Sequence, residues 1–243
     1  MINAGELRQR WRALPIGTLD DVIGGGTCLI LAPHPDDESL GCGGLIAACC
    51  AAGRPPVVVI LTDGSGSHAG SREYPKARLI ALRAAEVTEA VGILGLPSDR
   101  LMFLHQPDTQ APHAGPAFDA IVDLLADYAA VFGCSTILVP WLGDPHCDHV
   151  AAALVGSAAS HIARVRYVAY PVWGWMLPNM QPVEADAHGW RLDVTPYLAA
   201  KQRAIAAHAW QYGEVITDDP NGFHLPRALL EVFASPYEVF LLS

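Results

Sequence analysis

The sequence predicts an α/β fold, three layers deep, with a mostly parallel sheet between helices. Two observations carry this prediction. Short apolar runs alternate with helical patterns along the chain, and polar clusters rich in His and Asp follow directly after two of those runs. An alternating order of strands and helices is typical of a parallel sheet that is covered on both faces. Such sheets bind their ligands outside the carboxyl ends of the strands.

The first part of the chain shows the alternation most clearly. Residues 27–32 (TCLILA) form a short apolar run that ends at Pro33, which is typical of a strand buried on both faces. The small and apolar residues 40–52 suit a helix that ends before Gly53. The β-branched run at 57–62 predicts a second strand. The order strand, helix, strand predicts a βαβ unit.

The same alternation continues toward the C-terminus. Residues 63–74 are rich in Gly, Ser and His, which predicts a loop at the carboxyl end of the second strand. The further expected elements are a helix over 75–91, a strand over 101–104, a helix over 118–131, a strand over 136–139, an Ala-rich helix after Val150, a strand over 165–170, an irregular segment to about Asp186 and a helix over 196–210. No repeat or low-complexity linker interrupts this order, so we expect a single Rossmann-like domain over residues 1–243.

The composition is that of a folded protein without affinity for polyanions. The 243 residues are 51% hydrophobic and 16% charged, which excludes disorder as the main state. The 25 acidic and 15 basic residues leave a formal charge of −10, and no dense basic patch offsets it. Because this charge repels phosphate backbones, we expect no nucleic-acid partner.

The chain also lacks the sequence features of a membrane or secreted protein. The longest apolar run, residues 45–52, is far shorter than the roughly 20 residues of a membrane-spanning helix. The N-terminus has no apolar signal-peptide core. The six cysteines form no Cys-x-x-Cys pair, which suggests reduced thiols. We therefore expect no transmembrane segment and a cytoplasmic location.

Two polar clusters carry the chemistry. The first lies in APHPDDESLG after the strand at 27–32, and the second lies in GDPHCDHV after the strand at 136–139. Their members are His34, Asp36, Asp37 and Glu38 in the first cluster and Asp144, His146, Asp148 and His149 in the second. Because the carboxyl ends of parallel strands share one edge of the sheet, we expect the two clusters to meet in one crevice.

The residue types in this crevice predict a metal site. His34, Asp37 and His149 offer two imidazoles and one carboxylate, a set that leaves coordination positions open, as a catalytic zinc requires. Ferrous iron accepts the same ligands. Asp36 would then serve as general base for a water molecule, since a metal lowers the pKa of bound water to about 7. His146 would donate to the developing oxyanion, with Asp148 holding its second ring nitrogen.

Each cluster also has an ordinary structural interpretation. A Pro-Asp-Asp-Glu sequence before a helix is a common N-terminal capping arrangement, and the second cluster by itself could be a polar turn. Because both clusters follow strands of one alternating pattern, a coincidence of two structural features is the weaker explanation. We therefore favour the metal site.

The motifs in their order resemble those of the PIG-L or LmbE-like N-deacetylases, which include N-acetylglucosaminyl-phosphatidylinositol deacetylases and the deacetylases of mycothiol and bacillithiol biosynthesis. They are His34-Pro-Asp-Asp-Glu-Ser-Leu-Gly-Cys-Gly-Gly, Leu61-Thr-Asp-Gly, Arg83 with Glu86, and His146-Cys-Asp-His149. The resemblance covers about residues 27–155. It implies an LmbE-like fold and a zinc-dependent hydrolase that removes an N-acetyl group from an amino sugar or an amino-sugar conjugate.

The resemblance also implies roles for single residues. It places zinc on His34, Asp37 and His149, with Asp36 as general base and His146 as the stabiliser of the tetrahedral intermediate. Arg83 and Asp108 match positions with which members of the family grip sugar hydroxyls. Two departures stand out in this sequence. Cys147 replaces a common proline, and Trp210 replaces the serine of a C-terminal Lys, His and Ser-Gln pattern that Lys201, His208 and Gln211 otherwise follow.

Two other functions stay open at this point. A non-haem Fe(II) oxygenase also binds its metal with two histidines and a carboxylate, and His34-Pro-Asp36 matches the His-x-Asp part of that motif. Such triads usually sit on double-sheet β barrels, which the helix-rich pattern opposes. A catalytically silent carbohydrate-binding relative is the second alternative. The expected partner is a small N-acetylated amino-sugar substrate, and the aromatic residues near Trp173 would be the natural contact of a homo-oligomer.

Overall fold

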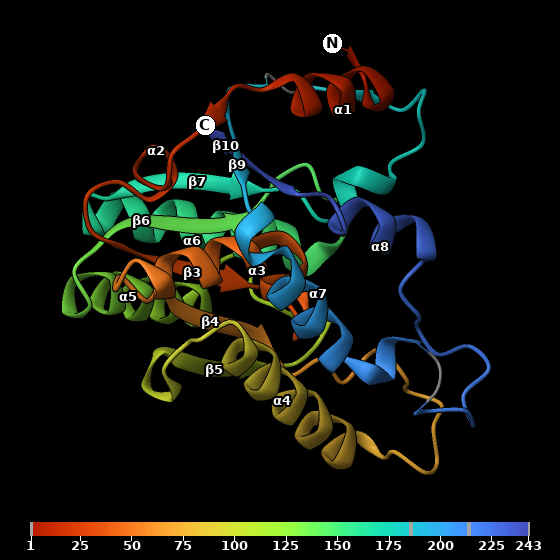
Figure 1. Ribbon diagram of the computed structural model, residues 1–243. Coiled ribbons are helices and arrows are strands. Elements are labelled where there is room, and N and C mark those ends of the chain that lie inside the picture. Colours follow the sequence, from red (N-terminus) through yellow and green to blue (C-terminus); the bar gives the residue numbers. More distant parts are fainter. Residues whose placement is uncertain (1, 185–186, 213–214, 243) are drawn as a thin grey trace.

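The architecture comes from a computed structural model, which describes residues 2–184, 187–212 and 215–242. Figure 1 shows a central sheet with helices on both faces. In the described residues the larger sheet has the strand order β2-β9-β10-β7-β6-β3-β4-β5, and a two-stranded sheet pairs β1 with β8. The α/β fold with a mostly parallel sheet is confirmed.

The parallel centre of the sheet follows the predicted alternation. Its strands are β3 (Thr27–Ala32), β4 (Val57–Thr62), β5 (Leu101–Gln106), β6 (Cys134–Pro140) and β7 (Arg166–Tyr170). The helices that follow the first four of these strands are α3 (Asp37–Ala51), α4 (Lys76–Ile93), α5 (Pro116–Val131) and α6 (Cys147–Ala163). A short 3-10 turn, η1 (Ser98–Arg100), leads into β5, and another, η2 (Trp173–Met176), follows β7.

The strands are buried because the side chains of each strand alternate between two apolar layers. Cys28 and Ile30 in β3 point into the layer that contains Leu45 of α3, together with residues of α4 and α7. Leu29 and Leu31 point into the opposite layer, formed with α5 and α6. Both faces of β3 are thus covered, which explains why the run is continuously apolar instead of alternating with polar residues.

The N-terminal and C-terminal segments add elements that the periodicity did not predict. They are β1 (Ile2–Asn3), α1 (Ala4–Ala13), β2 (Ile16–Gly17), α2 (Leu19–Ile23), β8 (Pro182–Val183), β9 (Gly189–Asp193), α8 (Arg227–Phe233) and β10 (Tyr237–Leu242). Strand β10 is antiparallel to both β7 and β9, so the sheet is mixed on this side. These strands carry little sequence signal because they are short or lie near the edge of the sheet.

Several helix boundaries differ from the predicted ones, and two of the differences bear on the polar clusters. Helix α3 begins at Asp37 and α6 begins at Cys147, so Asp37 and His149 lie in first helical turns. Helix α7 (Leu198–Ala207) is shorter than expected, because the 3-10 turns η3 (Thr195–Tyr197) and η4 (Ala209–Tyr212) take its ends. The expected end of the irregular segment at Asp186 lies outside the described residues.

The helices show no candidate for a membrane span. Among the residues that the structure describes, none of the helices combines the length and the apolar character needed to cross a bilayer.

The packing of α3 against the rest of the molecule gives a first test of the fold. A Cβ atom at Gly44 would lie 2.5 Å from the branched side chain of Val194, whereas a Cβ at Gly92 in α4 meets nothing within 4 Å. Gly44→Ala should therefore lower the free energy of unfolding by about 1–3 kcal/mol through overpacking. Gly92→Ala should raise it by about 0.5–1 kcal/mol through helix propensity. Urea unfolding of both variants checks the pair, and equal shifts would contradict this packing.

Candidate metal centre

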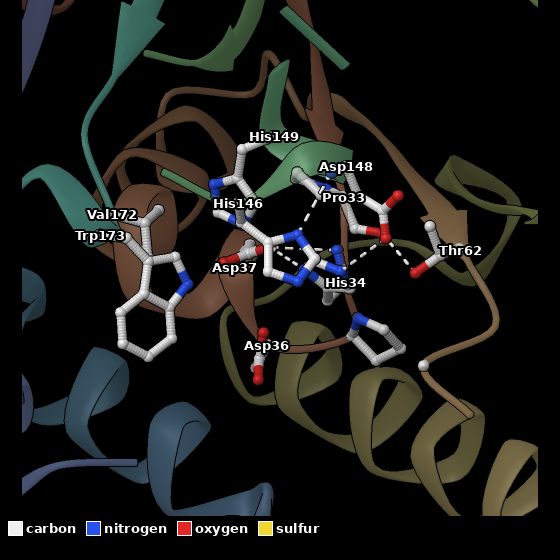
Figure 2. Close-up of polar contacts among 12 residues, drawn as sticks. Pro33, His34, Asp36, Asp37, Thr62, His146, Asp148, His149, Val172 and Trp173 are labelled. Atoms are coloured by element: carbon white, nitrogen blue, oxygen red, sulfur yellow. Dashed lines mark hydrogen bonds and ion pairs between the residues drawn. The ribbon is translucent and has the colours of Figure 1, made fainter. Parts of the chain in front are cut away.

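The two polar clusters meet because β3 and β6 are adjacent parallel strands. Leu29 pairs with Ile137 and Ile30 pairs with Leu138, so both strands end at the same edge of the sheet. Helices α3 and α6 begin directly beyond that edge. Figure 2 shows His34 and Asp37 of the first cluster turned toward His146, Asp148 and His149 of the second, whereas Asp36 points away from them.

Three atoms from the two clusters face each other in the interior. Asp37 Oδ2 lies 3.2 Å from His34 Nδ1 and 3.3 Å from His149 Nε2. His149 is completely buried, and its Nε2 makes no hydrogen bond to the described part of the chain, because its contact with Asp37 lacks hydrogen-bond alignment. A buried ring nitrogen without a hydrogen-bond partner is costly unless something else satisfies it. A divalent cation between these three atoms would do so.

The outer nitrogens of both histidines are held by other carboxylates. His34 Nε2 lies 3.1 Å from Asp148 Oδ2 and 3.5 Å from Asp108 Oδ1. His149 Nδ1 lies 2.9 Å from Asp144 Oδ2. With a cation bound, protons on these outer nitrogens would leave the lone pairs of the inner nitrogens free to bind it. Carboxylate partners of this kind fix the orientation and the tautomer of metal-binding histidines.

The charge around the histidines favours a cation. Burial alone would lower the pKa of His149, but the negative charge of Asp37 and the hydrogen bond with Asp144 raise it to about 9. Burial would likewise raise the pKa of Asp37, yet His149 and His34 hold it far below its usual range. The site thus gathers positive charge from its own imidazoles, a role that a divalent cation would take over.

A second grouping of ligand atoms uses the other nitrogen of His34. Atoms of His34, Asp108, His146 and Asp148 lie within 4.8 Å of one another, as do atoms of His34, His146 and His149. The carboxylate of Asp148, however, already accepts the backbone N–H groups of Thr109 and Ala111 at 2.7 and 3.1 Å. The Asp148 carboxylate is thus already the partner of two backbone N–H groups and of His34 Nε2, whereas His149 Nε2 has no hydrogen-bond partner in the described residues. We therefore favour the set His34, Asp37 and His149.

Asp36 lies beside this set on a strained backbone. Its φ of 142° falls in a region that costs a residue with a side chain about 1 to 3 kcal/mol. The peptide group before it is held at both ends, since Arg83 Nη2 donates to the Pro35 carbonyl at 2.7 Å and the Asp36 N–H donates to Glu38 Oε2 at 2.9 Å. Burial and the charge of Asp37 raise the pKa of Asp36 to about 7.

His146 caps the N-terminus of α6 through its ring. The backbone N–H of Asp148 donates to His146 Nδ1 at 3.2 Å. In the neutral imidazole the proton must then lie on Nε2, which makes this nitrogen a donor. Burial and the charges of His34 and His149 lower the pKa of His146, which favours the neutral ring.

The structure corrects the expected contact between Asp148 and His146. We expected the Asp148 carboxylate to hold the second nitrogen of His146, but the backbone N–H of Asp148 makes that contact. The carboxylate faces His34 instead. The reason is geometric, because the first turn of α6 directs the side chain of Asp148 toward the end of β3. Asp148 therefore orients His34.

The two expected sugar-binding residues both line the pocket above the cluster. Asp108 accepts the Gly66 N–H at 2.8 Å and is nearly buried. Arg83 is 2% exposed, donates to Gly64 as well as Pro35, and its guanidinium carbon lies 4.1 Å from the centre of the Trp210 ring. Much of its hydrogen-bonding capacity is thus used within the chain. A contact of Arg83 with substrate stays a prediction.

The pocket combines a polar floor with an aromatic wall. Its volume is about 240 Å³. The polar side includes His34, Asp36, Asp37, Asp108 and His146, and the apolar side consists of Leu40, Trp173, Trp210, Phe223 and Leu225. Trp173 and Phe223 are in edge-to-face contact at 5.7 Å. Such a pocket suits a ligand with hydroxyl groups on one side and an apolar face on the other.

Glu38, Asp144 and His208 are buried and support the site, but the sequence assigned them no role in it. Glu38 accepts His208 Nε2 at 3.2 Å as well as the Asp36 N–H, so α7 helps to fix the turn before α3. Asp144 accepts the N–H groups of Val172 and Trp173 and also contacts His149. Glu38 and Asp144 belong to the two clusters that the sequence showed. Their partners lie far away in sequence, so no local pattern could reveal these contacts.

The departures noted in the sequence are accommodated locally. Cys147 is exposed, and partial burial and the charge of Asp148 raise the pKa of its thiol. All six cysteines are free. Trp210 is buried against Arg83 and forms part of the pocket. The side chain of Gln211 lies outside the described residues.

Comparison with known proteins agrees with the motifs. Residues 29–160 match the PIG-L family, described as GlcNAc-PI de-N-acetylase. The diacetylchitobiose deacetylase of Thermococcus kodakarensis is 27% identical over 198 residues, which cover 76% of this chain and 70% of that protein.

Solved structures share the fold. The N,N'-diacetylchitobiose deacetylase of Pyrococcus horikoshii has a TM-score of 0.62 at 21% identity, over 89% of this chain and 83% of that one. GalB, the 4-carboxy-2-hydroxymuconate hydratase of Pseudomonas putida, also has a TM-score of 0.62, at 22% identity, over 76% of this chain and 80% of that one. Because a deacetylase and a hydratase share this architecture, the fold alone does not decide the reaction.

The contact between Asp144 and His149 can be tested through metal affinity. Asp144→Asn replaces an acceptor oxygen with an amide nitrogen, so His149 or a backbone N–H in η2 loses its partner. Affinity for Zn²⁺ should fall about 10- to 100-fold, as for other residues that orient metal-binding histidines. Chelator competition measures it, with Asp123→Asn on the exposed face of α5 as the matched control. Unchanged affinity in Asp144→Asn would remove Asp144 from the site.

Proposed function

The chain belongs to the PIG-L family, and from this premise we propose that it is a zinc-dependent N-deacetylase that hydrolyses the N-acetyl group of an amino sugar or an amino-sugar conjugate. The deacetylase activities of the family and of the Thermococcus relative support the reaction. The amino-sugar substrate is also supported by a pocket that both Asp108 and the aromatic Trp173 line.

One observation carries the proposal. His34 Nδ1, Asp37 Oδ2 and His149 Nε2 converge at 3.2 and 3.3 Å, with Asp36 and His146 on the pocket side of the same cluster. Two histidines and one carboxylate match a catalytic zinc site, because they leave positions for water and substrate. Ferrous iron suits the same ligands, so metal analysis of the purified protein must distinguish zinc from iron.

The bound cation would polarise the acetyl carbonyl and lower the pKa of the attacking water. Asp36, held by Arg83 and Glu38, takes the proton from that water as it attacks. His146 Nε2–H donates to the carbonyl oxygen as negative charge develops there. Asp36 then gives that proton to the leaving nitrogen, and acetate and a free amine are released.

The alternatives have less support. Oxygenase triads usually sit on double-sheet β barrels, which differ from the parallel sheet found here. A silent binding protein would not require Asp36 to adopt a costly backbone conformation next to the ligand set. A hydratase reaction like that of GalB would add water to a double bond and release no acetate. An assay for acetate from N-acetylglucosamine and its oligosaccharides separates all three from a deacetylase.

The general base and a metal ligand should respond differently to substitution. Asp36→Ala should keep its metal and lose about 10²–10⁴-fold in turnover, because the water loses its proton acceptor. His149→Ala should lose the metal together with the activity. Metal analysis combined with an acetate-release assay checks both. Equal turnover of Asp36→Ala and the unaltered protein would contradict the mechanism.

His146 needs a variant that keeps the helix cap. Asn is among the best N-cap residues, so His146→Asn should preserve the start of α6 while its shorter side chain no longer reaches the substrate oxygen. We expect kcat to fall about 10²–10³-fold with little change in KM, because the donor acts mainly in the transition state. A rise in KM at unchanged kcat would instead make His146 a substrate-binding residue.

A further inference from the structure

A second cavity lies behind the candidate active site. Its volume is about 370 Å³, and residues from α1, α3, α7, α8, β9 and β10 line it. In Figure 1, α1, β9, β10 and α8 lie in the upper half of the view, and α3 and α7 lie near its centre. It shares no lining residue with the pocket above the metal site, although Gly41 follows Leu40 of that pocket and Trp175 follows Trp173. Helix α3 and the turn η2 thus separate two distinct pockets.

Two arginines at this cavity have no carboxylate partner in the described part of the chain. Arg12 is exposed, and its guanidinium carbon lies 5.5 Å from the Trp175 ring. Arg191 donates from Nε to the Leu14 carbonyl at 2.8 Å and lies 4.8 Å from the Tyr237 ring.

The remaining charges of the cavity do not neutralise these arginines. Lys201 Nζ and Glu238 Oε1 form an ion pair at 2.7 Å, each 1% exposed, and Glu238 also accepts the N–H groups of Gly44 and Leu45. This pair balances itself. Glu231 on α8 is the other acidic lining residue, so the lining carries a net charge of +1. A positive cavity in a chain of formal charge −10 attracts anions.

The walls between the charges are aromatic. Trp175, Tyr237 and Phe233 line the cavity, and Trp175 is itself fixed by an edge-to-face contact with Trp11 at 5.0 Å. Flat apolar walls with a few convergent polar groups are the usual form of a small-molecule site. The planar fork of an arginine binds carboxylate and phosphate oxygens in pairs.

From this arrangement we propose that the cavity between α1, α8 and β10 is a second ligand site, which binds a small molecule with a ring and a carboxylate or phosphate group. The anionic group lies between Arg12 and Arg191, and the ring lies against Trp175 and Tyr237. The site is separate from the metal centre and needs neither the metal nor the deacetylase reaction.

Isothermal titration calorimetry on the full chain tests the proposal with phenyl phosphate and benzoate, which distinguish the two anionic groups. Benzyl alcohol is the neutral control and should not bind. Arg12→Gln and Arg191→Gln should each weaken binding about tenfold, since each removes a charge-assisted contact. Arg12 donates no hydrogen bond to the described residues, so its variant keeps the fold. Glu231→Gln should tighten binding about threefold, because it removes the unpaired negative charge.

The matched control is Arg203→Gln, which removes an exposed arginine of α7 that does not line the cavity. Its affinity for both probes should equal that of the unaltered protein. The proposal is overturned if neither probe binds. It is also overturned if both probes bind Arg12→Gln and Arg191→Gln as tightly as the unaltered protein, since the anion would then occupy the metal centre or another surface.

Discussion

The pairing of β3 with β6 is the constraint on which the candidate site depends. Only because these strands are parallel neighbours do their carboxyl ends share an edge, and only then do residues more than 100 positions apart meet around Asp37. Burial of both faces of β3 makes this pairing hard to change, because a shift of one residue would send every side chain to the opposite layer. The candidate metal site therefore inherits its geometry from the core.

Two further carboxylates, those of Asp148 and Asp144, orient the histidines of the candidate metal site. Asp148 and Asp144 each hold the outer nitrogen of one histidine, and each also collects backbone N–H groups from segments that are distant in sequence. One side chain thus orients a ligand and fixes a loop at the same time. In this way the turn with Trp173, which lines the pocket above the candidate metal site, is linked through Asp144 to His149.

The sequence predicted the central strands and the two clusters. It did not predict the contacts of single side chains or the antiparallel edge of the sheet, and the reasons are physical. The strands at 27–32 and 57–62 were predicted with their observed limits, because buried parallel strands are continuous apolar runs. The expectation that the two clusters meet followed from their positions after strands of one parallel sheet, whereas the adjacency of β3 and β6 came from the structure. The contacts of Glu38 with His208 and of Asp148 with His34 depend on which way side chains leave a helical turn, which composition does not encode. The antiparallel addition of β10 has too short a pattern to specify its neighbours.

Two adjacent carboxylates have different surroundings within a single turn, and this difference fits the separate roles proposed for them. Asp37 faces two imidazoles, which hold its pKa low and keep it anionic, as a metal ligand must be. Asp36 is turned away by its positive φ, and burial next to that fixed negative charge raises its pKa to about 7. Environments that separate the pKa values of neighbouring acids mark a division between a charged residue and a proton carrier. A purely structural N-cap would require neither the strain nor the separation.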